Sequence, residues 1–239
     1  MRYRFHFRAI PFVATVLLVA LGVSLGQWQD RRAADKTRTQ NTLTQRAAAA
    51  PVVVSDTPLQ AGAVELRRVS VAGEFVADWP LFLDNRPLDG KVGFYLVMPF
   101  KLAGSERHVL VARGWLPRYT GEHGRLPEFS TPRGTVVLHG VARTHLGKVM
   151  QLGQVAAVKP GAIMQNLTVE QYAAATSHPV QPFFIEQSTA VDNTDRLVRN
   201  WPAPALGVDK HRGYAFQWYA LALMALLFFV ITGFRRGSN

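Results

Sequence analysis

His211 is the residue of this chain best suited to chemistry. It stands just ahead of a long apolar segment, and on a helix its position shares a face with Tyr214 and Trp218. Two interpretations of this stripe are open. In the first, the aromatic rings and the imidazole form an interfacial belt in the headgroup zone of a membrane. In the second, the imidazole is an axial ligand of haem iron, with the aromatic rings against the macrocycle and Arg212 near a propionate.

The other histidines form no metal-binding pattern. Those in the middle of the chain fit no compact metal motif, and the fourth follows the third by six residues rather than four: His108, His123, His139, His145 and His178. The sequence has no Gly-x-Ser-x-Gly, Gly-rich phosphate loop or His-Glu-x-x-His. It also has no cysteine, which excludes disulfides and thiolate chemistry. A membrane-tethered hydrolase is a third hypothesis that these absences disfavour, and we predict that the protein is not an enzyme.

Two uncharged apolar segments, residues 10–28 and 214–234, must position His211. A bilayer core of about 30 Å needs ~20 apolar residues in a helix, and both segments meet that length. Trp28 suits an interfacial anchor at the end of the first segment, which argues against cleavage as a signal peptide. The chain is therefore predicted to be a hairpin of five parts: a cytoplasmic tail (1–9), a transmembrane helix (10–28), an extracytoplasmic domain (29–213), a second transmembrane helix (214–234) and a cytoplasmic tail (235–239).

Charge sets the predicted orientation. The formal net charge is +11, all 16 acidic residues lie between the apolar segments, and the two tails carry only bases. By the positive-inside rule both termini are cytoplasmic. No long Arg- and Ser-rich presequence precedes the first segment, which favours a bacterial cell (inner) membrane and a periplasmic central domain. The surplus of bases is expected to attract membrane lipid headgroups. Nucleic acid is not an expected partner, because the bases are scattered.

Between the apolar segments the pattern predicts one α+β domain dominated by antiparallel β-sheet, either open or closed into a barrel. Short runs rich in Val, Phe and Leu and bounded by Gly and Pro are typical of strands, and they fall at residues 64–71, 81–84, 92–100, 109–116, 135–141 and 183–186. One helix is predicted over residues 168–176, because Thr168 and Gln171 have capping-box spacing.

The connections to the apolar segments have different compositions. The alanine-rich stretch 30–50 is expected to extend the first membrane helix until Pro51 ends it. The proline-containing stretch 192–208 is expected to be an irregular loop. No Gly/Ser linker divides the middle of the chain, which favours a single domain.

Two short motifs in the domain have structural interpretations. Asn85 and Arg86, followed by a proline, suit a tight turn, since Asn tolerates the left-handed region. Gly114 beside Trp115 allows close backbone packing in a strand. For Arg86 and Arg113 the alternative is binding of a haem propionate or of an acidic patch on a partner.

Four blocks of sequence, in order along nearly the whole chain, resemble those of the Surfeit locus protein 1 family. Any one block alone would be a weak signal, whereas four in order are specific. The blocks are LGQWQDRR at residues 25–32, the group 73–75, 83–86 and 90–94, VLVARGWLP at 109–117, and KHRGYAFQWY at 210–219.

This resemblance implies an assembly factor for cytochrome c oxidase. Family members are implicated in binding haem a and in aiding its insertion into cytochrome c oxidase subunit I, and haem a synthase is a further candidate partner. The histidine proposed as iron ligand in bacterial members corresponds to His211. Asp209 and Lys210 precede it here, where members often carry Asn or a similar small polar residue. The alternative function is a membrane scaffold that stabilises an oxidase assembly intermediate without binding haem.

Overall fold

The computed structural model describes residues 3–5, 7–119, 126–151, 156–191, 195–202 and 207–236. The chain divides into two compact units. Residues 1–44 and 203–239 form the first, and residues 45–202 form the second. The second unit is shorter than the predicted domain 29–213, because the helices of the first unit extend beyond the apolar segments.

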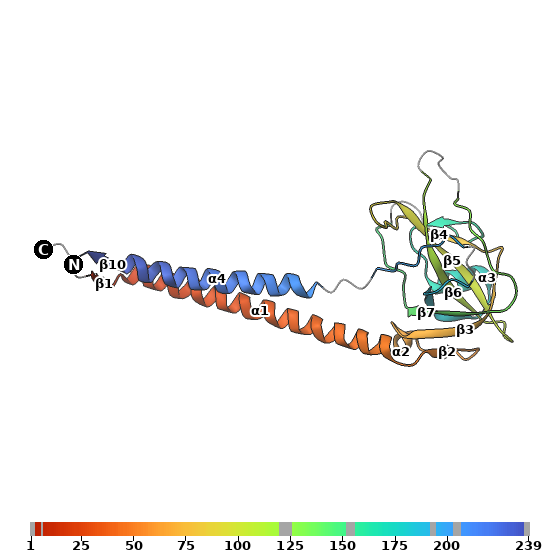
Figure 1. Ribbon diagram of the computed structural model, residues 1–239, viewed down its shortest axis with the longest axis horizontal. Helices are drawn as coiled ribbons and strands as arrows, with labels where there is room; N and C mark the ends of the chain where they lie inside the picture. The colour runs from red at the N-terminus through yellow and green to blue at the C-terminus, as the bar shows by residue number, and fades with distance from the viewer. Residues whose placement is uncertain are drawn as a thin grey trace. The chain divides into compact units, whose positions relative to one another are not determined.

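The first unit is a pair of long helices. α1 (Ala9–Ala48) and α4 (Val208–Gly233) lie side by side (Figure 1). Each contains an apolar stretch long enough to cross a membrane, and only 17% and 11% of the two stretches is buried. The remaining apolar surface is suited to contact with lipid. α1 continues beyond the apolar segment to Ala48 and ends before Pro51, as the sequence predicts.

The first and last described strands of the chain lie at the same end of the helix pair (Figure 1). β1 (Tyr3–Phe5) pairs antiparallel with β10 (Phe234–Arg236). This pairing holds β1 and β10 together at one end of the helix pair.

The second unit is built on a β-barrel. Strands pair in the order β3 (Arg68–Phe75), β7 (Val136–Arg143), β9 (Val180–Gln187), β6 (His108–Pro117) and β5 (Gly93–Leu102). β5 then pairs back onto β3, which closes the ring. The antiparallel pairings predominate, although β6 and β9 run parallel. The prediction of an α+β domain dominated by antiparallel sheet is confirmed, in its closed form.

Short elements complete this unit. β2 (Val52–Val54) runs parallel to β3, β4 (Leu81–Leu83) runs antiparallel to β5, and β8 (Ile163–Met164) runs parallel to β4. α2 (Ala61–Val64) precedes β3. α3 (Val169–Thr176) begins with the predicted capping box, in which Thr168 and Gln171 bond each other's backbone N–H groups.

The core has two layers that follow the alternation of strand side chains. Inward-facing residues from all five barrel strands fill the barrel; they include Val69, Val71, Phe94, Leu96, Met98, Phe100, Val111, Leu138, Phe183 and Ile185. A second layer lies outside the barrel between α3 and the outer face of β4, β5, β6 and β9. It includes Leu81, Val97, Leu110, Phe184, Val169 and Tyr172.

The predicted strand 64–71 is wrong in its position. Val64 ends α2 and the strand begins at Arg68. Leu66 between them has a φ of 60°, which breaks the extended backbone that alternation alone predicts. The other predicted strands match β4, β5, β6, β7 and β9 to within a few residues.

The predicted loop 192–208 ends one residue too far along the chain, because Val208 already belongs to α4. Of that loop, residues 195–202 are described without a helix and make one isolated bridge, between Val198 and Trp115. Residues 192–194 and 203–206 lie outside the described residues.

Candidate functional site

His211 lies on the face of α4 that packs against α1. Buried and half-buried positions along this face recur every three or four residues, as in a left-handed coiled coil, and they are His211, Ala215, Trp218, Ala222, Ala225 and Phe229. Tyr214 is 53% exposed and lies off this face. The stripe expected from the sequence is therefore present for His211 and Trp218, while Tyr214 is directed away from α1.

Two glycines of α1 allow the helices to approach closely. A Cβ at Gly22 would lie 2.9 Å from Cβ of Ala222, and a Cβ at Gly26 would overlap the ring of Tyr219. Both glycines are buried. Small residues four positions apart are typical of closely packed membrane helices. This spacing is a signal in the sequence for the helix–helix interface, and our prediction of the site did not use it.

The His211 imidazole is hydrogen-bonded across the helix pair. Its Nδ1 lies 2.7 Å from Oε1 of Gln29 on α1. Because an amide oxygen can only accept, Nδ1 carries the proton and donates it. In a neutral imidazole the lone pair is then on Nε2. Histidines that bind metals almost always have their other ring nitrogen held in this way.

Gln29 is a site residue that the sequence did not reveal. It lies 182 positions from His211, so no local spacing could connect the two. A second bond across the same pair joins the neighbouring residue, since the Tyr219 hydroxyl donates to Oδ2 of Asp30 at 2.8 Å. These two bonds fix how α4 is rotated against α1.

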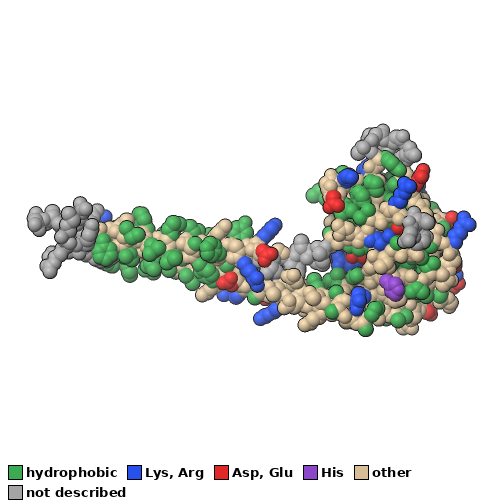
Figure 2. Space-filling view, viewed as in Figure 1, with side chains coloured by type: hydrophobic (Ala, Val, Ile, Leu, Met, Phe, Trp, Pro, Cys, Tyr) green, Lys and Arg blue, Asp and Glu red, His purple; other side chains and the backbone are tan. Residues whose placement is uncertain are grey.

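This site lies where the surface of the helix pair changes from apolar to charged. Figure 2 shows hydrophobic side chains over most of the pair and charged side chains at the end away from the termini. Arg212 is exposed there. Trp28 is 44% exposed, and the Arg32 guanidinium lies over its ring at 5.8 Å from the centroid. An amphipathic Trp at such a boundary is typical of a membrane interface.

A groove of about 370 Å³ opens between the two helices next to Trp218. Its lining is apolar and comes from both helices: Leu18, Leu21 and Gly22 of α1, and Trp218, Leu221, Met224, Ala225 and Phe228 of α4. We refer to it as the interhelical groove.

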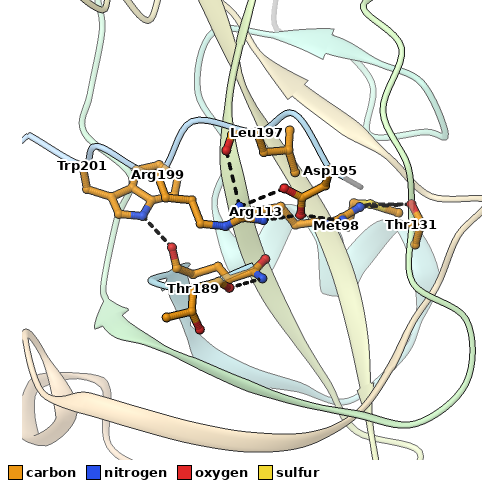
Figure 3. Close-up of polar contacts among 9 residues, drawn as sticks. Met98, Arg113, Thr131, Thr189, Asp195, Leu197, Arg199 and Trp201 are labelled. Carbon is orange, nitrogen blue, oxygen red and sulfur yellow. Dashed lines mark hydrogen bonds and ion pairs between the residues drawn. The ribbon is translucent and has the colours of Figure 1, made fainter. Parts of the chain in front are cut away.

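Arg113 is buried inside the barrel and has a structural role. Its side chain is fully buried, and a nitrogen of its guanidinium lies 3.7 Å from a carboxylate oxygen of Asp195 (Figure 3). Arg199 binds the same carboxylate. The Arg113 guanidinium also contacts Thr131 at 3.0 Å and the Phe75 ring at 4.6 Å. Its acidic partner is therefore Asp195 of the same chain, which favours the structural interpretation.

Arg86 is likewise used within the domain. It is 5% exposed, and its Nη2 donates to the carbonyls of Gln165 and Gly147 at 3.0 and 3.3 Å. Burial lowers the pKa of Arg86, and the nearby Tyr95 partly offsets this by raising it. The guanidinium lies over the Tyr95 ring. Asn85 has a φ of 58°, as expected for the tight turn.

Gly114 and Trp115 attach two loops to β6. A Cβ at Gly114 would lie 2.7 Å from Cβ of Leu197, so glycine is needed for the close approach predicted from the sequence. The Trp115 indole N–H donates to the carbonyl of Arg86 at 2.6 Å, and its backbone pairs with Val198. These residues hold the barrel together, and none of them belongs to the helix pair.

One buried and one half-buried titratable group of the barrel were not predicted from the sequence. His108 is 5% exposed and its Nδ1 lies 3.2 Å from the Tyr172 hydroxyl; burial and the nearby His178 lower the pKa of His108 to about 4. Glu186 lies 3.4 Å from Nε of Arg143, yet burial raises the pKa of Glu186 to about 7. Among the described residues, no three His, Asp or Glu side chains gather as a metal site.

Two membrane-length helices joined to a β-barrel define this molecule as a membrane-anchored β-barrel protein. The sequence matches the SURF1 family over residues 16–223, and the chain belongs to that family. The resemblance seen in the four sequence blocks is thus confirmed. The SURF1 family is known generally as a family of cytochrome c oxidase assembly factors and not of catalytic enzymes.

Relatives of the chain come from several eukaryotes. A SURF1-like protein of Monosiga brevicollis is 24% identical over 228 residues, which is 90% of this chain and 84% of the relative. A SURF1-like protein of Caenorhabditis briggsae is 25% identical over 247 residues, covering 89% of this chain and 72% of the relative. A SURF1-like protein of Drosophila melanogaster is 30% identical over 119 residues, covering 43% of this chain and 40% of the relative.

Proposed function

We propose that this protein binds haem a through His211 and aids its insertion into subunit I of cytochrome c oxidase. The observation that carries this proposal is the hydrogen bond between Gln29 and Nδ1 of His211. That bond directs the lone pair of a half-buried imidazole to Nε2, the nitrogen that a haem iron would need.

The residues around His211 fit such a ligand. When bound, haem a would supply an iron that Nε2 of His211 could ligate. Gln29 orients the ring and sets its tautomer. Trp218, on the same face of α4, offers an aromatic surface, and the exposed Arg212 can pair with a propionate. A single protein ligand suits a carrier, since it holds the cofactor less firmly than two ligands would.

We further propose that both termini are cytoplasmic and that the barrel lies in the periplasm of a bacterium. The tails that contain only bases and the shared end of the helix pair support this orientation. Subunit I, haem a synthase and membrane lipid are the partners proposed with it. All three are reached from the membrane.

Haem content of the purified protein tests the proposal. Full-length protein is prepared in detergent from cells that make haem a, and the absorption spectrum is recorded. We expect bound haem in the wild type and none in His211→Ala, with His145→Ala as an exposed histidine control. Gln29→Ala should weaken binding roughly 10–100-fold, as other losses of such supporting bonds do. Gln27→Ala, exposed on the same helix, should not.

The same spectra distinguish the alternative function. Unchanged haem content in His211→Ala would exclude this ligand. A wild-type protein that supports oxidase assembly but never carries haem would instead indicate a scaffold that stabilises an assembly intermediate.

A further inference from the structure

The interhelical groove begins about two helical turns along α4 from the proposed iron ligand His211. Trp218 lines the end of the groove that is nearest to His211. It follows His211 by seven residues and lies on the same face of α4. At a rise of 1.5 Å per residue, this places the start of the groove about 10 Å from His211 along the helix axis. The α4 lining continues to Phe228, so the groove follows roughly 15 Å of helix.

The groove is a channel with small residues at its floor and larger side chains at its walls. The smallest lining residues, Gly22 and Ala225, are buried or half-buried. Leu18, Leu221 and Phe228 form raised walls and are 55%, 49% and 70% exposed. The lining of the channel suits an aliphatic chain, and the bases Lys210 and Arg212 flank His211 on either side along α4.

We propose that the interhelical groove receives the farnesyl chain of haem a while His211 holds the iron. This inference rests on the proposed function. Haem a has anionic propionates and an apolar isoprenoid chain on one macrocycle. Near the start of α4 the helix pair presents an imidazole flanked by two bases, and farther along α4 it presents an apolar channel. This order complements a ligand with a charged head and an attached chain, whereas a free lipid acyl chain would gain nothing from His211.

The expected preference for the chain is modest. Lipid tails are as apolar as the groove, so the hydrophobic effect contributes little inside a bilayer. The gain comes from van der Waals packing against the groove walls. It also comes from attachment, because the chain is delivered by a macrocycle that is already bound. We expect the farnesyl chain to raise affinity about three- to tenfold.

Titration of the full-length protein in detergent with three haems tests this inference. Haem b lacks the farnesyl chain, haem o carries it, and haem a carries both the chain and the formyl group. Wild-type protein should bind haem o and haem a about three- to tenfold more tightly than haem b. Ala225→Leu fills the floor and should reduce the affinity for haem o and haem a to that for haem b. Ala220→Leu makes the same change at an exposed position on the other side of α4 and should alter nothing.

Each result has a separate meaning. Equal wild-type affinities for haem b and haem o would overturn the groove proposal and leave His211 as the ligand. An equal loss for all three haems in Ala225→Leu would also overturn it, since the chain would then have no contact of its own. Failure of the proposed function is seen separately, as binding of haem b that is unchanged in His211→Ala.

Discussion

Replacing Asp195 with asparagine should strongly destabilise the barrel. The Asp195 carboxylate lies between two guanidiniums, and its side chain is 1% exposed. The side chains of Arg113 and Arg199 are 0% and 10% exposed. Asp195→Asn removes the negative charge and leaves two cations close together in surroundings of low dielectric constant. Removing one partner of a buried ion pair costs about 3–5 kcal/mol.

This loss is large beside the whole stability of a domain, which is about 5–15 kcal/mol. For a domain of this size it corresponds to a fall in melting temperature of roughly 6–20 °C. Urea unfolding of the full-length protein in detergent, followed by tryptophan fluorescence, measures it. The matched control is Asp84→Asn, whose carboxylate lies 3.2 Å from Arg118 in a pair with side chains 22% and 41% exposed. Such a pair contributes about 0.2–1 kcal/mol.

Equal losses in the two variants would refute the argument that charge burial governs this cluster. A further test removes all three charges at once, by Arg113→Met, Asp195→Leu and Arg199→Met. Replacement of buried ion groups by apolar residues is often neutral or stabilising. The triple variant should therefore be more stable than Asp195→Asn alone, although it changes more residues.

Three further predictions concern the helix pair, the pH dependence and the topology. Gly26→Ala should lower the melting temperature of the helix signal in circular dichroism, because its Cβ meets a ring of α4, whereas Gly213→Ala, with open space around it, should not. Burial lowers the pKa of His108 from 6.5 to about 4, so the contribution of neutral His108 to the stability of the fold is lost as pH falls through that range. Burial raises the pKa of Glu186 from 4.5 to about 7, so the contribution of protonated Glu186 to the stability of the fold is lost as pH rises through that range. The two effects oppose each other between about pH 4.5 and 6.5. In this range, urea unfolding should show that stability rises with pH in Glu186→Gln and falls with pH in His108→Gln. If stability had the same pH dependence in both variants, both assignments would be contradicted. Because the chain has no cysteine, Met150→Cys, at a site 78% exposed, should react in intact cells with an impermeant maleimide, and a cysteine added at the C-terminus should react only after permeabilisation.

The sequence predicted those features that depend on neighbours along the chain. Strand runs such as β6 are recognisable because apolar residues and bounding prolines are local. The capping box of α3 needs only Thr168 and Gln171, three positions apart. The uncharged apolar segments are equally local, and the structure places them in two membrane-length helices.

Features that depend on distant pairing were not predicted. Closure of the barrel requires β5 to meet both β6 and β3, and no local pattern states which strands pair. β3 begins later than predicted because Leu66 adopts a left-handed backbone conformation, which leucine rarely does and which its type therefore does not predict. The contact between Gln29 and His211 joins residues 182 positions apart and depends on which faces of α1 and α4 pack together, which no local pattern states.

The sequence blocks shared with the family therefore act in two physically separate ways. In the block at residues 109–117, Arg113, Gly114 and Trp115 contact the chain's own loops inside the barrel unit. In the block at 210–219, His211 faces the helix interface and Trp218 borders an apolar groove. Because the first set is buried within the barrel unit, whereas His211 is half-buried and makes one hydrogen bond across the helix pair, substitutions in the first set should reduce folded protein. Substitutions at His211 should leave folded protein in the membrane and reduce what it binds.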